Sequence, residues 1–160
     1  MERVKQKILI VDDDSYFLDS LKRRLIEDGF DVFGAKNGED GLREMRDTKP
    51  DLVLLDLHMP IKDGFATLNE KRNNKEIAAI PVIMISESND PKYIDDALTF
   101  GVRDYVVKSN LDQRELIEKI RLQLGAPDVQ TNFDQVGKVA DPARSATLSG
   151  YTKLWVEDDT

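Results

Sequence analysis

The nine residues LVLLDLHMP, at positions 52–60, place a carboxylate directly after an uninterrupted apolar run. The run of four apolar residues is bounded by Pro50 before it and Pro60 after it. Such a run is typical of a short strand that is buried on both faces of a sheet. A charge inside a core is costly unless it is paired or binds a metal. We therefore expect Asp56 to lie at the end of a central strand, at the rim of the sheet.

Short apolar runs alternate with helical patterns from residue 7 to residue 124. Strands are predicted at residues 7–11, 30–35, 52–55, 81–85 and 104–107. The first helix is predicted from Ser15, which we expect to cap it. Further helices are predicted over 38–47, after the turn at 62–64, over 91–100, and between Asp112 and Leu124. Strands that alternate with helices predict an α/β fold, with a doubly wound parallel sheet of five strands covered by helices on both faces.

Composition excludes several classes of protein. The formal net charge of −8 over 160 residues argues against a nucleic-acid surface, because phosphate binding needs clustered Lys and Arg. The absence of cysteine excludes disulfides, thiolate catalysis and cysteine-ligated metals. The polar N-terminal residues precede only four apolar ones, which predicts neither a signal peptide nor a membrane span. We expect a cytoplasmic protein that binds neither nucleic acid nor membrane.

Charged and polar residues follow four of the predicted strands. They are Asp12, Asp13 and Asp14 after the first strand, Asp56 after the third, Ser86 after the fourth and Lys108 after the fifth. The carboxyl ends of parallel strands form the edge at which α/β sheets bind ligands. Clustered carboxylates repel one another unless a cation lies between them, and oxygen ligands without His or Cys favour Mg²⁺. A carboxylate nucleophile beside a cation and two anion donors predicts phosphoryl transfer to Asp56. Asp14 is expected to belong to the solvated turn and helix start, as a first-turn charge.

These residues together resemble the receiver domain of two-component response regulators. The motifs that carry the resemblance are Val11-Asp12-Asp13, Asp56 with Met59-Pro60 and Asp63-Gly64, Ser86, and Tyr105-Val106-Val107-Lys108. The resemblance covers about residues 5–124, so we place a receiver domain at 1–124. It implies a flavodoxin-like sheet of strand order 2-1-3-4-5.

The resemblance also implies a role for each acidic residue. Asp56 would accept a phosphoryl group from the phosphohistidine of a sensor kinase or a phosphotransfer protein. Asp13 and Asp56 would bind Mg²⁺ through their side chains, His58 through its backbone carbonyl, and Asp12 mostly through a metal-bound water. The protein would not be an enzyme, although it would promote its own phosphorylation and dephosphorylation.

A switch is implied by the same resemblance. Ser86 and Lys108 would each bind a phosphoryl oxygen, and Tyr105 would change rotamer between states. The face formed by the fourth helix, the fifth strand and the fifth helix would then change for an output protein or for homodimerisation. Glu87 stands where the family usually has a small residue, and we expect Glu87, Ser88 and His58 to modulate access to the site. Ser109 follows Lys108 where receivers usually carry a proline.

The last 36 residues, 125–160, differ from the rest and are interpreted as a C-terminal extension. An apolar stripe predicts a helix at 129–140, and a β-rich run around the sole Trp predicts a short strand at 151–156. We expect the extension to act in partner binding or dimerisation and not as a DNA-binding or enzymatic output domain.

Two other functions are weighed. An aspartyl-phosphate phosphatase of the haloacid dehalogenase type places a second acid two residues after the nucleophile, whereas His58 occupies that position. A phosphorylation-independent receiver-like interaction module would keep the fold without the chemistry. The complete set of acceptor, metal-binding and anion-binding residues favours the phosphorylated switch.

Overall fold

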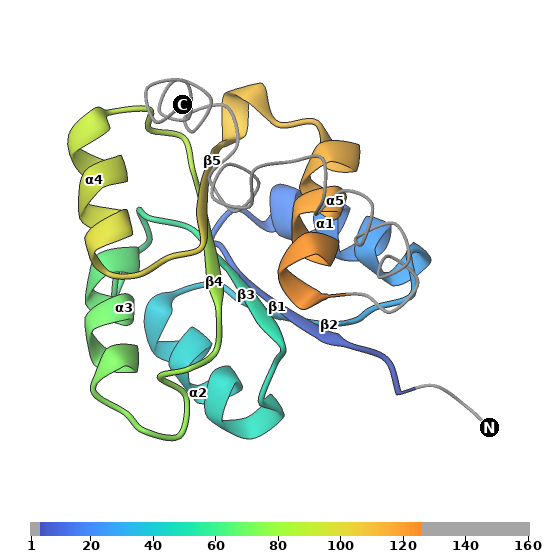
Figure 1. Ribbon diagram of the computed structural model, residues 1–160, viewed down its shortest axis with the longest axis horizontal. Helices are drawn as coiled ribbons and strands as arrows, with labels where there is room; N and C mark the ends of the chain where they lie inside the picture. The colour runs from blue at the N-terminus through green and yellow to red at the C-terminus, as the bar shows by residue number, and fades with distance from the viewer. Residues whose placement is uncertain (1–3, 126–160) are drawn as a thin grey trace, which may run out of the picture.

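The computed structural model describes residues 4–125 of the 160-residue chain (Figure 1). Five parallel strands form one sheet of order β2-β1-β3-β4-β5. The strands are β1 (Lys7–Val11), β2 (Asp31–Ala35), β3 (Leu52–Leu55), β4 (Val82–Ser86) and β5 (Asp104–Val107). The predicted fold class and strand order are confirmed. The helix predicted at 129–140 and the strand predicted at 151–156 lie outside the described residues and stay predictions.

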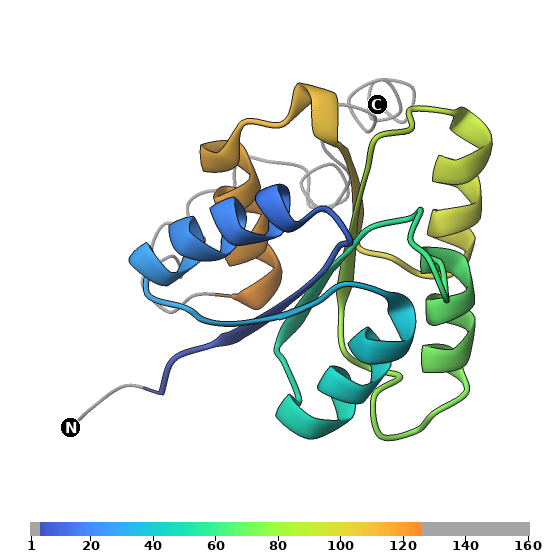
Figure 2. The same cartoon turned by 180° about the vertical axis from the view of Figure 1, so that it is seen from behind.

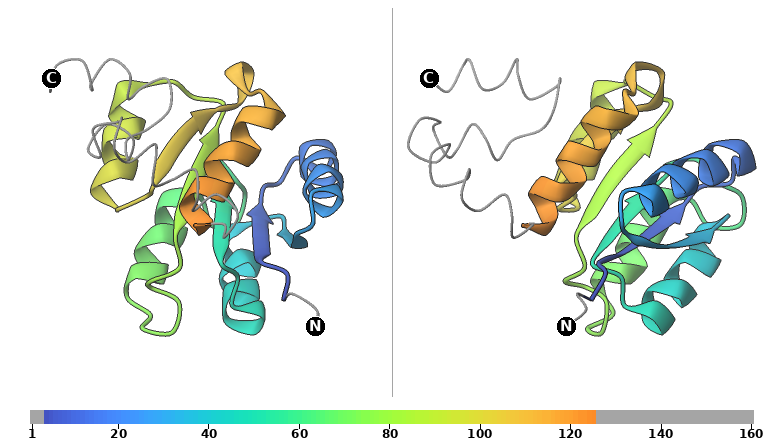
Figure 3. Two further views of the ribbon diagram at one scale, coloured as in Figure 1. Left: turned by 45° about the vertical axis from the view of Figure 1, so that its right-hand side comes forward. Right: turned by 90° about the vertical axis from the view of Figure 1, so that its right-hand side faces the viewer.

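Helices cover both faces of the sheet (Figures 2 and 3). They are α1 (Ser15–Glu27), α2 (Gly38–Thr48), α3 (Gly64–Arg72), α4 (Pro91–Thr99) and α5 (Gln113–Leu124), with a 3₁₀ helix, η1 (Lys108–Asn110), after β5. The buried residues of α1 and α5 pack on one face, and those of α2, α3 and α4 pack on the other. The sheet is therefore the middle of three layers, as expected for a doubly wound fold.

Each central strand contributes side chains to both layers of the core. In β1, Ile8 and Ile10 belong to the cluster under α1 and α5, whereas Leu9 and Val11 belong to the cluster under α2, α3 and α4. All four side chains are at most 1% exposed. This alternation follows from the two-residue period of a strand, and burial on both faces explains the continuous apolar runs.

The first helix begins differently from the prediction. Asp14, not Ser15, is its N-cap, and the Asp14 side chain accepts the backbone N–H groups of Tyr16 and Phe17 at 3.1 and 3.2 Å. A cap must stand one residue before the first helical turn to reach these amides, and Ser15 already lies inside the helix. Asp14 belongs to the helix start and is exposed, as expected, but it caps the helix one residue before the first turn.

Other boundaries shift by one residue. The Phe30 N–H donates to the carbonyl of Leu25 and so closes α1, which leaves Asp31 as the first residue of β2. Strand β4 extends one residue further than predicted and takes in Ser86. Asp112 caps α5 as expected, with its side chain accepting the Arg114 N–H at 2.9 Å.

Candidate functional site

Three aspartates gather where β1 and β3 end. Asp12 and Asp13 follow β1 directly, and Asp56 follows β3. One carboxylate oxygen from each lies within 4.8 Å of those of the other two. Asp12 is 2% exposed and Asp56 is 6% exposed, whereas Asp13 is exposed to solvent. The sequence prediction that these side chains meet is therefore correct in geometry.

The register of the sheet fixes the two buried aspartates side by side. Val11 of β1 pairs with Leu55 of β3. The hydrogen bonds continue one residue beyond this pair, because the Asp56 N–H donates to the Val11 carbonyl and the Asp12 N–H donates to the Ala35 carbonyl, both at 2.9 Å. These bonds fix the backbones of Asp12 and Asp56 at neighbouring strand ends.

One oxygen of each buried carboxylate is held by a neighbouring backbone amide. Asp12 Oδ1 accepts the Asp14 N–H at 2.9 Å, and Asp56 Oδ1 accepts the Leu57 N–H at 2.8 Å. The second oxygen of each faces the ammonium of Lys108. Lys108 Nζ lies 2.7 Å from Asp12 Oδ2 and 3.9 Å from Asp56 Oδ2. Lys108 therefore pairs with Asp12 directly and leaves Asp56 the less compensated of the two.

Lys108 is held in place from two sides. Its side chain is 8% exposed, and its ammonium lies 4.5 Å from the centre of the Phe17 ring. Burial lowers the pKa of Lys108, but the hydrogen bond to Asp12 and the charge of Asp56 outweigh burial and raise it above its ordinary value. The ammonium is thus charged at neutral pH and adds a cation–π contact to its ion pair.

Burial dominates the electrostatics of the acidic cluster. It raises the pKa of Asp56 to about 7, with the nearby charge of Asp12 as the second cause, and Lys108 only partly opposes this shift. Burial also raises the pKa of Asp12 despite its hydrogen bond to Lys108. The cluster is therefore short of positive charge, which is the condition that a cation relieves.

Ser86 and Tyr105 are linked through a third residue. Ser86 is fully buried, and its Oγ accepts the Ser88 N–H at 3.1 Å. The Tyr105 hydroxyl donates to the Ser88 carbonyl at 2.8 Å, and the Tyr105 side chain is 2% exposed. Burial raises the pKa of the Tyr105 hydroxyl, so it remains a donor. The Tyr105 ring is part of the hydrophobic core.

The rim of the site carries Glu87 and His58. Glu87 is exposed, and its charge helps to raise the pKa of Lys108, which places it within electrostatic reach of the ammonium. His58 is also exposed, and its ring makes an edge contact with Tyr93 at 5.5 Å between centroids. Their expected role in modulating access to the site stays a prediction.

The loop after β3 needs a glycine where its backbone passes close to Asp56. Gly64 donates its N–H to the Leu57 carbonyl at 2.7 Å. A Cβ at this position would lie 2.6 Å from the Asp56 carbonyl oxygen and 2.9 Å from Leu57 Cα. The Asp63-Gly64 pair therefore does two things, because Asp63 caps α3 and Gly64 allows the backbone to pass closely beneath Asp56.

The segment after Lys108 differs from the usual proline-containing loop. Ser109 lies in the 3₁₀ helix η1, and the Leu111 N–H donates to the Lys108 carbonyl at 3.1 Å. No peptide bond among residues 4–125 is cis. The loop thus turns through a 3₁₀ helix with a trans bond after the lysine.

The sequence predicts the charged residues of the site, but it does not predict two of the contacts that support them. The sequence predicts no role for Phe17 in the site, because a cation–π contact gives no sequence signal of its own. The carbonyl of Ser88 receives the Tyr105 hydroxyl, and a backbone acceptor of this kind leaves no trace in side-chain patterns.

A parallel sheet of order 2-1-3-4-5 with an acidic cluster at its central strand ends defines a flavodoxin-like α/β domain with a candidate metal site. The family model for the response regulator receiver domain matches residues 8–121, and the chain belongs to this family. Receiver domains generally bind Mg²⁺ at an acidic pocket of this kind, and they interact with histidine kinases and output domains.

Two curated relatives carry the receiver sequence at moderate identity. The chain is 37% identical over 134 residues to "Probable transcriptional regulator ycf27" of Porphyra purpurea, which covers 83% of this chain and 54% of that protein. It is 31% identical over 155 residues to "DNA-binding response regulator MtrA" of Mycobacterium bovis, covering 94% and 65%. The chain spans about half the length of the ycf27 proteins that it matches.

Solved structures share the fold. A CheY-like receiver domain protein from Methanospirillum hungatei is 30% identical with a TM-score of 0.71, over 76% of this chain and 95% of that one. CheY4 of Vibrio cholerae, at 21% identity and a TM-score of 0.70, covers 76% and 100% and shares the fold. Within residues 4–125, no helix has the length and apolar character needed to cross a membrane.

The electrostatics of Asp56 predict how stability depends on pH. The folded pKa of about 7 exceeds the value of 3.8 of an ordinary aspartate, so stability present at low pH is lost as pH rises through 7. Without divalent cations, Asp56→Asn should therefore raise the free energy of unfolding at pH 8 by about 2–4 kcal/mol, and by much less at pH 5. Thermal unfolding in EDTA at both pH values measures this difference.

A surface control is available on β2. Asp31→Asn removes an exposed carboxylate and should change stability by no more than about 0.5 kcal/mol at either pH. A gain from Asp56→Asn that is equal at pH 5 and pH 8 would contradict the buried-charge account.

Proposed function

We propose that this chain is a phosphorylation-dependent signalling switch in which Asp56 accepts a phosphoryl group from a phosphohistidine of a sensor kinase or phosphotransfer protein. The observation that carries the proposal is the position of Asp56. Its carboxylate is almost buried, is grouped with two further carboxylates, and lies 3.9 Å from a lysine ammonium. Family membership supports the same reading.

The donor set of the cluster fits Mg²⁺. Three carboxylates offer hard oxygen ligands, and the buried pair needs compensation by a cation. In this proposal Asp13 and Asp56 bind the ion through their side chains, His58 through its carbonyl, and Asp12 through a water. The ion would neutralise charge on the transferring phosphoryl group.

The transfer itself uses the side chains at the strand ends. An oxygen of the Asp56 carboxylate attacks phosphorus while the P–N bond to the donor imidazole breaks, and the imidazole nitrogen keeps the electron pair and takes up a proton. Ser86 donates its hydroxyl to one phosphoryl oxygen. Lys108 has three N–H donors, so it can bind a second phosphoryl oxygen while it keeps its contact with Asp12.

The route from the site to the surface runs through Ser88. In the described structure Ser86 holds the Ser88 amide, and Ser88 holds the Tyr105 hydroxyl. When Ser86 turns toward a phosphoryl oxygen, it releases the Ser88 amide, and the loop before α4 is free to shift. Tyr105 would then lose its acceptor and change rotamer, which alters the face made by α4, β5 and α5 for an output protein or a second copy.

Partners follow from this face and from the charge of the chain. A kinase or phosphotransfer protein would bind at the Asp56 end of the sheet. The name of the MtrA relative describes that protein as DNA-binding. The net charge of −8 of the present chain favours a protein partner over a direct nucleic-acid contact. We place the switch in the cytoplasm, and we propose that residues 125–160 take part in partner binding or dimerisation.

The acceptor can be tested by intact-mass spectrometry with acetyl phosphate and Mg²⁺. The wild-type chain should gain about 80 Da, the mass of one phosphoryl group in a covalent intermediate. Asp56→Asn should gain nothing, Asp31→Asn should behave as the wild type, and EDTA should abolish the adduct. An undiminished adduct in Asp56→Asn would remove Asp56 as the acceptor.

The position of Glu87 predicts slow entry of small anionic donors. Its negative charge stands within electrostatic reach of Lys108, beside the approach to Asp56. Glu87→Gln should therefore speed phosphorylation by acetyl phosphate roughly two- to threefold at low ionic strength, and the gain should vanish at high salt because exposed charges are screened. Stopped-flow fluorescence or timed mass spectrometry gives the rates.

A matched control for Glu87 lies elsewhere on the surface. Glu76 is an exposed glutamate near the amino ends of the strands, and Glu76→Gln should leave the rate unchanged. Equal phosphorylation rates for Glu87→Gln and Glu76→Gln at low salt would show that Glu87 does not slow the entry of acetyl phosphate.

A further inference from the structure

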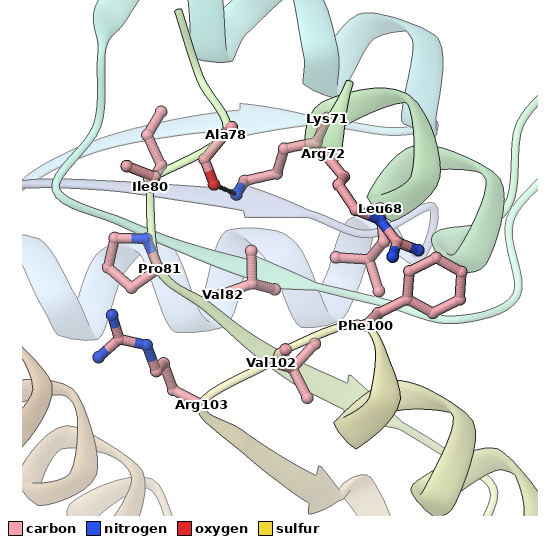
Figure 4. Close-up of a pocket in the computed structure, with 12 residues that line it drawn as sticks. Leu68, Lys71, Arg72, Ala78, Ile80, Pro81, Val82, Phe100, Val102 and Arg103 are labelled. Carbon is pink, nitrogen blue, oxygen red and sulfur yellow. Dashed lines mark hydrogen bonds between the residues drawn. The ribbon is translucent and has the colours of Figure 1, made fainter. Parts of the chain in front are cut away.

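A second concave site lies at the amino ends of β4 and β5, away from the acidic cluster (Figure 4). The cavity measures about 320 Å³ and lies between the last turn of α3, the segment entering β4 and the segment that joins α4 to β5. Its size is at the lower end of the range for small-molecule sites. Three cationic residues line it, and none of its twelve lining residues is acidic.

Lys71 is the most unusual of these cations. Its side chain is 6% exposed, and its ammonium donates one hydrogen bond, to the Ala78 carbonyl at 3.0 Å (Figure 4). Within residues 4–125 no carboxylate forms an ion pair with it. Burial, together with the charge of Arg103, lowers the pKa of Lys71 to about 8. An ammonium has three N–H donors, so two of them have capacity for a ligand.

Two arginines add to the positive charge. The Arg72 guanidinium lies 4.6 Å from the centre of the Phe100 ring, and Arg103 reaches Gln123 of α5 at 3.4 Å. Within residues 4–125, neither arginine forms a salt bridge with a carboxylate. In a chain with a net charge of −8, three cations without acidic partners around one cavity favour an anionic occupant.

The cavity also has an apolar surface. Leu68, Val82 and Val102 line it, and Figure 4 shows Val82 and Val102 between the cationic side chains. Free inorganic phosphate could use the charges but not this surface. A ligand that uses both must carry an anionic group on an apolar body.

We propose that this cavity binds a small organic carboxylate, with the carboxylate on Lys71 and Arg103 and the apolar body against Leu68, Val82 and Val102. The cavity volume limits the ligand to about ten non-hydrogen atoms, the size of an aromatic or branched aliphatic acid. Such a ligand gives the buried ammonium the counter-charge that it lacks.

The two sites lie at opposite ends of the strands. Ser86 ends β4 and Lys108 follows β5, whereas Pro81 and Arg103 of the cavity precede these same strands. Binding of the carboxylate does not require Asp56 or Mg²⁺. The proposal therefore stands or fails independently of phosphorylation.

Titration of the ¹⁵N-labelled full chain with benzoate, followed by amide NMR shifts, tests the proposal. Benzoate should saturate a single site with a millimolar dissociation constant, as expected for a ligand of this size, with shifts at the cavity residues. Benzamide has the same shape without the charge and should bind at least tenfold more weakly. Inorganic phosphate should not displace benzoate at equal concentration.

Variants separate the cavity from general surface charge. Lys71→Met keeps the apolar stem, so it should remain folded while weakening benzoate at least tenfold, and Arg103→Gln should weaken it severalfold. Lys75→Gln, an exposed lysine three residues beyond Arg72, and Asp56→Asn should bind as the wild type. Equal affinity for benzoate and benzamide, or undiminished binding by folded Lys71→Met, would overturn the proposal.

Discussion

The candidate site depends on one constraint: two carboxylates, those of Asp12 and Asp56, are buried next to each other. The backbones of Asp12 and Asp56 are fixed as neighbours, because the Asp56 amide donates to Val11 of β1 and the Asp12 amide donates to Ala35 of β2. Both side chains are almost fully buried. Burial and the charge of Asp12 raise the pKa of Asp56 to about 7, and a cation bound at the site would favour its ionised form.

Lys108 meets only part of that demand. Its ammonium hydrogen-bonds Asp12 and lies 3.9 Å from Asp56. The charge of Asp56, the proposed acceptor, is therefore less compensated than that of Asp12. The same arrangement explains why the proposed chemistry and the proposed switch share one place. A metal ion and a phosphoryl group would each change the charge that Ser86 and Lys108 face, and Ser86 is joined to Tyr105 through Ser88.

The sequence predicted the strands of the sheet, because burial on both faces leaves a continuous apolar run. It also predicted that the charged residues lie together, because parallel strands end at a common edge. It was insufficient where one residue of offset decides the contact, as with Asp14 and Ser15 at the start of α1. It could not show that Lys108 pairs with Asp12 before Asp56, since that choice depends on distances near 3 Å.

Lys71 illustrates the same limit away from the site. In the sequence it is an ordinary lysine in the last turn of a helix, where cations are favourable. Only the packing of α3 against the segment entering β4 buries it, and only then does its lack of an acidic partner become visible. Sequence patterns predict which face of a helix is apolar, but they do not predict which charged residue becomes enclosed at the end of it.

The state of the Asp56 carboxylate is the quantity that tests the central claim most directly. Side-chain ¹³C NMR can follow its titration in the metal-free chain and again with saturating Mg²⁺. The account predicts a pKa of about 7 without metal and a clear fall when Mg²⁺ is added. A pKa near the ordinary value of 3.8 that Mg²⁺ leaves unchanged would mean that Asp56 is already compensated, and the account would be wrong.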